Sequence, residues 1–475
     1  MTIQKIKSIM YYVVIALAVS VAGLKQAHAD STSDIVNALV MKGVLTEEEG
    51  ALITKGHSGE KVAAKKEKDT TVHAASKMNI RGYLQVRNTT MLSGDEGVNL
   101  WSDRSVGNKN SLADQDKNFL IRRARVIISG SAGDRLDYYI QPDFASTAGT
   151  TGNVAQLRDA YGDVNLTKDK VHRVRVGQSK VPYGFENLQS SQNRLALDRA
   201  DAFNSAVRDE RDLGAFYYYT PDNIQKLFKE IQDAGLKHSG NYGMFGIGVY
   251  NGQGANQQDR NDNYHTVARL TYPWKTESGQ IYEAGVQGYT GKYVRTGSAY
   301  RRNMGNNVYA TKTPTLEPGN TTGFKDERMG VSFMMYPQPF GLQGEWNWGK
   351  TPGLDTAAST DGIIKETNLN GGYIQTMYKI DNFKVLDTNG TLIPFVRWQY
   401  FDGASKAETN SPMNKVNDWE AGAEWQIAPE VELVAYYHHM NRSNLVTGAT
   451  ATTIAKQDYA NFKADALRVQ LQYNF

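Results

Sequence analysis

The last residues of the chain, Asp465–Phe475, read DALRVQLQYNF and alternate strictly between apolar and polar side chains. Successive side chains of a β-strand point to opposite faces, so this stretch forms a strand with two unlike faces. One face carries Leu467, Val469, Leu471, Tyr473 and Phe475, and the other carries Arg468, Gln470, Gln472 and Asn474. Such a strand is typical of a transmembrane β-barrel, which is apolar toward lipid and polar toward the lumen.

The same texture runs backward from this stretch to residue 79, with Gly-, Asn- and Asp-rich connections between alternating segments. About sixteen segments can be counted, an even number, as a closed single-chain barrel requires. We therefore predict an all-β fold, an antiparallel transmembrane barrel. The predicted strands are 79–92, 117–130, 134–144, 155–167, 171–181, 211–220, 241–251, 262–273, 279–293, 326–337, 340–350, 368–380, 391–402, 415–427, 430–441 and 459–475.

The connections alternate between long and short, as expected when both chain ends lie in the periplasm. Links such as 131–133 and 338–339 are very short, whereas 294–325 is long. One connection breaks this rule: 221–240 is long and partly helical where a short turn is due, so the strand count could differ by two there. A soluble sandwich or propeller is the rival fold. The outward set of 415–427 favours the barrel, because aromatic residues near both ends suit girdles at the two membrane interfaces.

The N-terminus has the pattern of a cleaved export signal. Lys5 and Lys7 precede an apolar core, and Ala27-His28-Ala29 forms a small-x-small cleavage site. We expect a signal peptide at 1–29, a periplasmic helix and lysine-rich linker at 30–78, and the barrel at 79–475. Removing Lys5, Lys7 and Lys25 leaves 50 basic and 50 acidic residues. Any charge preference must then come from where the charges lie.

Motifs for catalysis or cofactors are weak. Gly344–Thr351, GEWNWGKT, matches the phosphate-binding-loop pattern, but Trp346 and Trp348 have strand spacing and Pro352 disfavours the helix that must follow. His438 and His439 are neighbours in a predicted strand, so they point to opposite faces and do not share a metal ion. We predict no enzyme activity, cofactor, metal or nucleic-acid partner.

The alternation assigns arginines to the lumen. Arg81 and Arg87, Arg123 and Arg125, and Arg173 and Arg175 face inward, because the reverse assignment would place them in lipid at about 2–4 kcal/mol each. Arg122 falls on the lipid face and is expected near an interface. Later strands carry inward glutamates, namely Glu283, Glu345, Glu420, Glu424 and Glu432, with Arg269, Arg397 and Arg468 between them. One wall should therefore be basic and part of the opposite wall acidic.

The connection 182–210 is too long for a plain surface loop. Its apolar residues Phe185, Leu188, Leu195, Leu197 and Phe203 can anchor it. We predict that it folds into the barrel and narrows the lumen.

Several stretches resemble the phosphate-selective porin O/P family. They are FLIRRARVIISGSAGDRLDYYIQPDF, LRDAYGDVNL, VRVGQSKVPYGFENLQSS and IVNALVMKGVLTEEEGALI. The resemblance implies a sixteen-stranded outer-membrane porin, usually a homotrimer, that passes small anions such as phosphate along arginine and lysine. It adds Lys180, Arg194, Arg199, Arg208 and Arg211 to the candidates for anion binding. Lipid and lipopolysaccharide are the expected surroundings.

The loop departs from a purely basic constriction, because it also holds Glu186, Asp198, Asp201, Asp209 and Glu210. Two alternatives stay open at this point. One is a general or cation-preferring diffusion porin. The other is a structural barrel that holds a partner protein, for which a wide lumen without an inward loop is expected.

Overall fold

The computed structural model describes residues 36–37, 39–42, 44–55, 77–95, 98, 100, 103, 117–148, 151–304, 308–445 and 458–475. The chain divides into two units, Met1–Ala75 and Ser76–Phe475. The predicted signal peptide and linker lie outside the described residues. No helix within the described ranges is long and apolar enough to cross a membrane.

The first unit contains a short helix at residues 47–55. A reciprocal capping box starts it: the backbone N–H of Glu49 donates to Thr46 Oγ1 at 3.2 Å, and that of Thr46 donates to Glu49 Oε2 at 2.9 Å. Such a box satisfies N–H groups that a helix start otherwise leaves free. The helix predicted for this part of the chain is therefore present.

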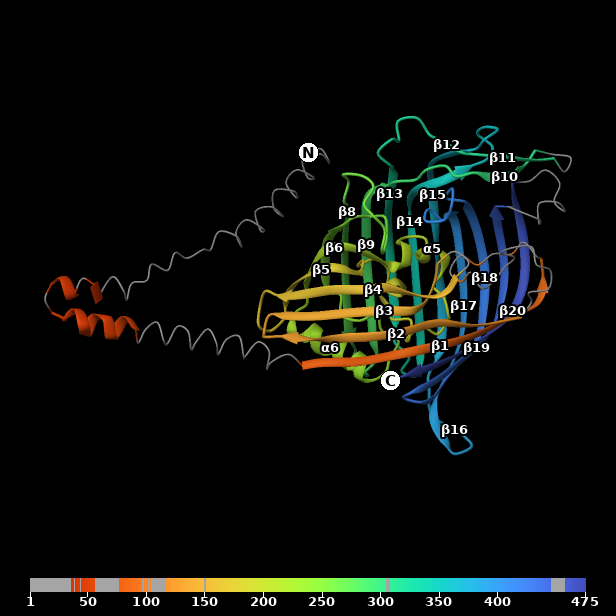
Figure 1. Ribbon diagram of the computed structural model, residues 1–475. Coiled ribbons are helices and arrows are strands. Elements are labelled where there is room, and N and C mark those ends of the chain that lie inside the picture. Colours follow the sequence, from red (N-terminus) through yellow and green to blue (C-terminus); the bar gives the residue numbers. More distant parts are fainter. Residues whose placement is uncertain are drawn as a thin grey trace. The chain divides into compact units, whose positions relative to one another are not determined.

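The second unit is a closed antiparallel barrel (Figure 1). Each barrel strand pairs with the next barrel strand, as β9 does with β13 and β15 with β17, and β1 also pairs with β20. The sixteen barrel strands are β1 (Lys77–Gly94), β2 (Lys117–Ala132), β3 (Leu136–Ala148), β4 (Thr151–Asn165), β5 (His172–Lys180), β6 (Arg211–Tyr219), β7 (Phe245–Tyr250), β8 (His265–Lys275), β9 (Ile281–Tyr293), β13 (Phe324–Met335), β14 (Phe340–Asp355), β15 (Ile363–Tyr378), β17 (Thr388–Ala404), β18 (Met413–Ala428), β19 (Val431–Leu445) and β20 (Tyr459–Asn474).

The remaining strands are extensions and loop elements. β16 (Ile380–Val385) prolongs the β15–β17 hairpin, and β10 (Tyr300–Asn303), β11 (Tyr309–Lys312) and β12 (Thr315–Leu316) belong to the long connection after β9. In Figure 1 these loop strands lie at one end of the barrel, and β16, α6 and the C-terminus lie toward the other.

The C-terminal stretch closes the barrel. The backbone N–H of Gly82 donates to the carbonyl of Phe475 at 2.7 Å, and the N–H of Phe475 returns a bond of 3.0 Å. A Cβ on Gly82 would lie 2.6 Å from the Phe475 ring, so only glycine leaves room for the terminal aromatic. The alternating last strand, β20, thus forms the seam at which the barrel closes against β1.

The predicted strand pattern is confirmed in number and order. The connection at 221–240 adds no strand; it contains helix α6 (Asp222–Asp233), so the count of sixteen stands. The main difference is strand length. β14 and β15 pair as far as Asp355 and Ile363, so most of the predicted loop 351–367 is hairpin. GEWNWGKT lies wholly within β14, and Trp348 is 47% exposed on the outer face.

The two faces follow the predicted alternation with one correction. Ile80 and Val176 are exposed on the outside, whereas Arg87 and Arg175 are buried inside. The predicted position of Arg122 on the lipid face is wrong. β1 pairs Gln85 with Arg123 and Val86 with Ile121, so Arg122 is the extra residue of a β-bulge. Its guanidinium lies 3.7 Å from the carboxylate of Asp198 in the inward loop.

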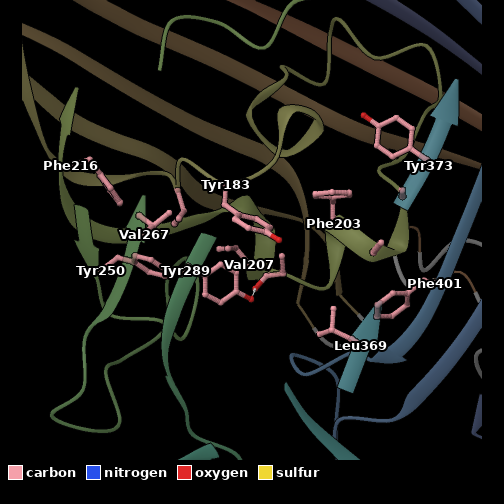
Figure 2. Packing of buried hydrophobic residues seen from close by; sticks show 14 of the residues in the cluster. Tyr183, Phe203, Val207, Phe216, Tyr250, Val267, Tyr289, Leu369, Tyr373 and Phe401 are labelled. Atoms are coloured by element: carbon pink, nitrogen blue, oxygen red, sulfur yellow. Dashed lines mark hydrogen bonds between the residues drawn. The ribbon is translucent and has the colours of Figure 1, made fainter. Parts of the chain in front are cut away.

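Residues 182–210, the constriction loop, fold into the barrel as predicted. All five predicted anchors are buried: Phe185, Leu188, Leu195, Leu197 and Phe203. The loop contains α4 (Phe185–Leu188), α5 (Asp201–Asn204) and the 3₁₀ turn η1 (Arg208–Glu210). Figure 2 shows Tyr183, Phe203 and Val207 between Phe216 and Tyr250 on one side and Tyr373 and Phe401 on the other. The loop therefore bridges the lumen rather than lining one wall.

Candidate permeation site

The constriction loop begins at a turn that requires glycine. Gly184 has φ of 80°, and a Cβ there would lie 2.8 Å from the Phe203 ring. Directly after it, the backbone N–H groups of Phe185 and Glu186 donate to the two carboxylate oxygens of Glu345 on β14, at 2.5 and 2.7 Å. The wall glutamate predicted to face the lumen is thus an anchor for the loop.

The acidic residues of the loop pair with arginines of the wall. Asp198 lies 3.0 Å from Arg87 and 2.6 Å from Arg468. Glu186 contacts Arg397 at 3.0 Å, and Asp201 contacts Arg442 at 2.6 Å. Burial alone would raise the pKa of Asp198, but the two arginines hold that pKa below its ordinary value. These carboxylates fasten the loop and do not make the constriction acidic.

A basic cluster surrounds Glu210 at the end of the loop. Four cations share this one carboxylate: Lys180 at 3.2 Å, Arg194 at 3.4 Å, Arg199 at 3.1 Å and Arg211 at 3.0 Å. Counting carboxylates of the described residues, Arg211 alone among these four has a second one within 4 Å, that of Asp159 at 2.9 Å. Burial favours the neutral form of Glu210, but the surrounding cations hold its pKa well below the usual range. The cluster keeps a surplus of positive charge.

Arg123 extends this surplus along β2. Its guanidinium donates to the amide oxygen of Gln85 at 2.8 Å, and within the described residues no carboxylate lies within 4 Å of it. It lies close enough to Arg122, Arg125 and Arg194 for their charges to act on it. Arg125 differs, because Asp143 accepts from it at 2.7 Å. Arg123 is therefore a lumen cation held among like charges.

The structure divides the predicted site residues by exposure. Those buried beneath the loop or against the wall are Arg87, Arg123, Arg125, Arg175, Lys180, Arg194 and Arg211. Those that keep exposed surface are Arg81, Arg173, Arg199 and Arg208. Lys180 also donates to the carbonyls of Leu188 and Gln189, at 3.1 and 2.8 Å, so it holds the end of α4.

The exposed members are spread along the barrel. Arg81 and Arg173 lie near the starts of β1 and β5, and Arg208 lies near the end of the constriction loop, against Gly254 in the connection between β7 and β8.

Sequence reasoning left out Arg328 on β13 and Arg442 on β19, which the alternation of those strands places inward, and it also missed two lumen arginines on β2 and β4. Arg158 lies 3.6 Å from Asp143 and 3.2 Å from Asp209, and it sits where the β3–β4 register shifts, between Leu157 and Asp159. Arg122 occupies the bulge in β2. Both residues are extra to a strict two-residue alternation, which therefore gives no signal for them.

Charge is separated across the lumen, as the sequence predicts. Inward cations of β1–β5 are Arg81, Arg87, Arg122, Arg123, Arg125, Arg158, Arg173, Arg175 and Lys180, and the inward carboxylates there are Asp137, Asp143, Asp159 and Asp163. We call these strands the early wall. On the late wall, β8 to β20, carboxylates are in the majority: Glu283, Asp326, Glu345, Asp418, Glu420, Glu424 and Glu432 against Arg269, Arg328, Arg397, Arg442 and Arg468.

The neighbouring histidines do not form a common site. His438 is buried against Asp418 at 3.0 Å, and His439 lies on the outer face at 2.7 Å from Asp465. Across the described ranges, no group of three or more His, Asp or Glu side chains is placed to hold a metal ion.

A sixteen-stranded barrel with an inward loop and a basic early wall can be compared with known proteins. The family model described as phosphate-selective porin O and P matches residues 96–475. The chain belongs to the phosphate-selective porin O and P family. Family membership and the closed barrel identify this porin as an outer-membrane channel. A search of curated proteins gave no match.

Solved porin structures share low identity with this porin. The outer-membrane channel DcaP of Acinetobacter baumannii is 14% identical, with 85% of this chain and 98% of that chain covered at a TM-score of 0.46. Salmonella typhi OmpF, solved in complex with daunomycin, is 12% identical, with 84% and 98% covered at a TM-score of 0.49. An anion-selective porin from Comamonas acidovorans is 11% identical, with 84% and 100% covered at 0.45. At these values we draw nothing further from the likeness.

Proposed function

We propose that this porin is a diffusion channel that prefers small anions and guides them along the early wall. The observation that carries the proposal is the basic cluster, in which four cations share Glu210. Beside it lies Arg123, which has no carboxylate of a described residue within 4 Å. Unneutralised charge in a narrow, low-dielectric lumen raises the local concentration of counter-ions. Chloride and phosphate would therefore enter more readily than potassium.

Phosphate is the solute class that we propose for the exposed arginines. A guanidinium offers a planar fork of donors that matches phosphate oxygens. One such contact at ~4 Å contributes roughly 4 kcal/mol at an effective dielectric of about 20, before the cost of desolvation. Arg208, Arg199, Arg173 and Arg81 are spread along the path, and several weak sites in series let an anion enter without being trapped.

The lumen favours a channel over a barrel that holds a partner protein. The constriction loop crosses it from β5 to β17, and α6 packs below that loop, so both occupy the space that a partner would need. We also propose, from sequence and family, that the signal peptide is cleaved after Ala29 and that the porin assembles as a homotrimer in lipid and lipopolysaccharide.

Phosphate titration of the single-channel chloride current tests the solute. Purified porin in a planar bilayer should lose chloride current as phosphate is added at constant ionic strength, with half-block at a concentration that rises in Arg173→Gln and Arg199→Gln. Sulfate serves as the matched anion. Equal block by sulfate would make the path general for oxyanions, and no block by either would remove the arginines from solute binding.

A further inference from the structure

The periplasmic connection between β6 and β7 is long and partly helical where a short turn is expected. It is not part of the anion path proposed above. We call residues 221–240 the inner-mouth segment. Its helix α6 presents Ile224, Phe228 and Ile231 on one side, all buried, and Lys226 and Lys229 on the other, both exposed. An amphipathic helix of this kind needs an apolar surface to pack against.

That surface is the inside of the barrel. The apolar residues of the segment join one buried cluster with inward residues at the periplasmic ends of late-wall strands, namely Ile281, Met334, Tyr336, Met377, Ile393, Phe395 and Val434. The cluster also includes Phe185, Leu195 and Leu197 of the constriction loop. The segment therefore lies within the lumen, beneath the loop and against the late wall.

A buried ion pair fixes the end of the segment. Lys237 contacts the carboxylate of Glu424 on β18, and both side chains are almost fully buried. Glu432 on β19 lies near enough for Glu424 and Lys237 both to act on its charge. The backbone carbonyl of Lys237 accepts from the side chain of Gln189 in the constriction loop at 3.2 Å. The side chain of Lys237 thus lies close to two late-wall glutamates, and its backbone carbonyl links the inner-mouth segment to the constriction loop.

From these contacts we infer that the inner-mouth segment is a second constriction that sets ion selectivity. It covers the apolar and acidic late wall in the periplasmic half of the lumen, and Lys237 neutralises carboxylates that would otherwise attract cations. The open path is confined to the early wall, past Arg173 and Arg81. The selectivity part of this inference rests on the proposed anion preference; the narrowing part does not.

Lys237→Gln tests the charge. Without the ammonium, Glu424 and Glu432 lose their counter-charge, and the anion-to-cation permeability ratio, measured from the zero-current potential at a pH high enough to keep both carboxylates ionised, should fall several-fold. Lys237→Arg should restore the ratio. Lys229→Gln is the matched control, because Lys229 lies on the exposed face of α6 and pairs with Asp233 at 2.6 Å. An unchanged ratio in Lys237→Gln would overturn the assignment.

Replacing residues 222–236 by a short Asn-Gly turn tests the narrowing. The conductance should rise several-fold, because the segment no longer occupies the lumen. Conductance equal to that of the native porin would show that the segment does not narrow the path. If the native porin has no anion preference, the proposed function is wrong. The conductance comparison still tests whether the inner-mouth segment narrows the lumen. If the turn variant does not fold, the Lys237 variants decide the inference.

Discussion

The two segments that enter the lumen are held there in different ways. The constriction loop is fastened by buried ion pairs from Asp198, Glu186 and Asp201 to wall arginines, in addition to its buried apolar anchors. The inner-mouth segment is fastened mainly by apolar packing of α6, with a buried ion pair at Lys237 and an exposed one from Glu230 to Lys275 of β8 at 2.5 Å. The comparison teaches that a loop inside the lumen can be fixed by several buried ion pairs as well as by apolar packing, whereas the helix at the inner mouth depends chiefly on its apolar face. The two should therefore respond to different perturbations.

Glu210→Gln should produce the largest effect. The change keeps the shape of the side chain but leaves Lys180, Arg194, Arg199 and Arg211 to repel one another. Breaking a buried ion pair by removing one partner costs about 3–5 kcal/mol. Hydrogen exchange of loop amides should report a loss of protection of this order, with α6 unaffected. Asp209→Asn, next to it and about a third exposed, is the control; equal losses in both variants would show that Glu210 is not the anchor.

As the pH falls, the constriction loop should lose its packing in the lumen before helix α6 does. The pKa values of Asp198 and Glu210 are lowered in the folded state, so their contribution to stability is complete above the ordinary pKa of about 4. It is lost as the pH falls through the lower folded pKa values. Protection of the amides next to Asp198 and Glu210 should stay constant from pH 7 to 5 and fall only in stronger acid. A fall between pH 7 and 5 would contradict this account.

Phe228→Ala should affect α6 instead. Phe228 is 8% exposed, and truncating a buried phenylalanine costs about 3 kcal/mol. Protection of α6 amides should fall, and the conductance should rise, while amides of α5 in the loop keep their protection. Lys229→Ala, on the exposed side of the same helix, should change stability by about 0.5 kcal/mol or less. A comparable change in both variants would argue against packing inside the lumen.

Arg123→Gln should have the smallest effect on stability and a measurable one on selectivity. Removing one charge of several in the lumen changes the energy of a passing anion by about 1 kcal/mol, a roughly fivefold effect. The permeability ratio should move toward cations at unchanged barrel stability. Arg301→Gln, at an exposed position in the connection after β9, should leave the ratio as it is. A ratio unaffected by Arg123→Gln would separate the basic cluster from selectivity.

The sequence was sufficient for the barrel because lipid on one side and water on the other enforce a two-residue period. It also predicted the inward loop from its length and its apolar anchors, such as Phe185 and Phe203. It failed at Arg122 and Arg158, because a β-bulge shifts the register by one residue without a marker in composition. Nor could it show that Asp198 meets Arg468, since these residues are far apart in the chain and their pairing depends on closure of the barrel.

The zero-current potential of native porin in a planar bilayer under a KCl gradient tests the central claim most directly. A potential with the sign of a chloride-preferring pore is the result that this account predicts, because the basic cluster outweighs the covered late-wall carboxylates. A potential near zero, or one with the sign of a potassium-preferring pore, would contradict it and leave a general diffusion porin.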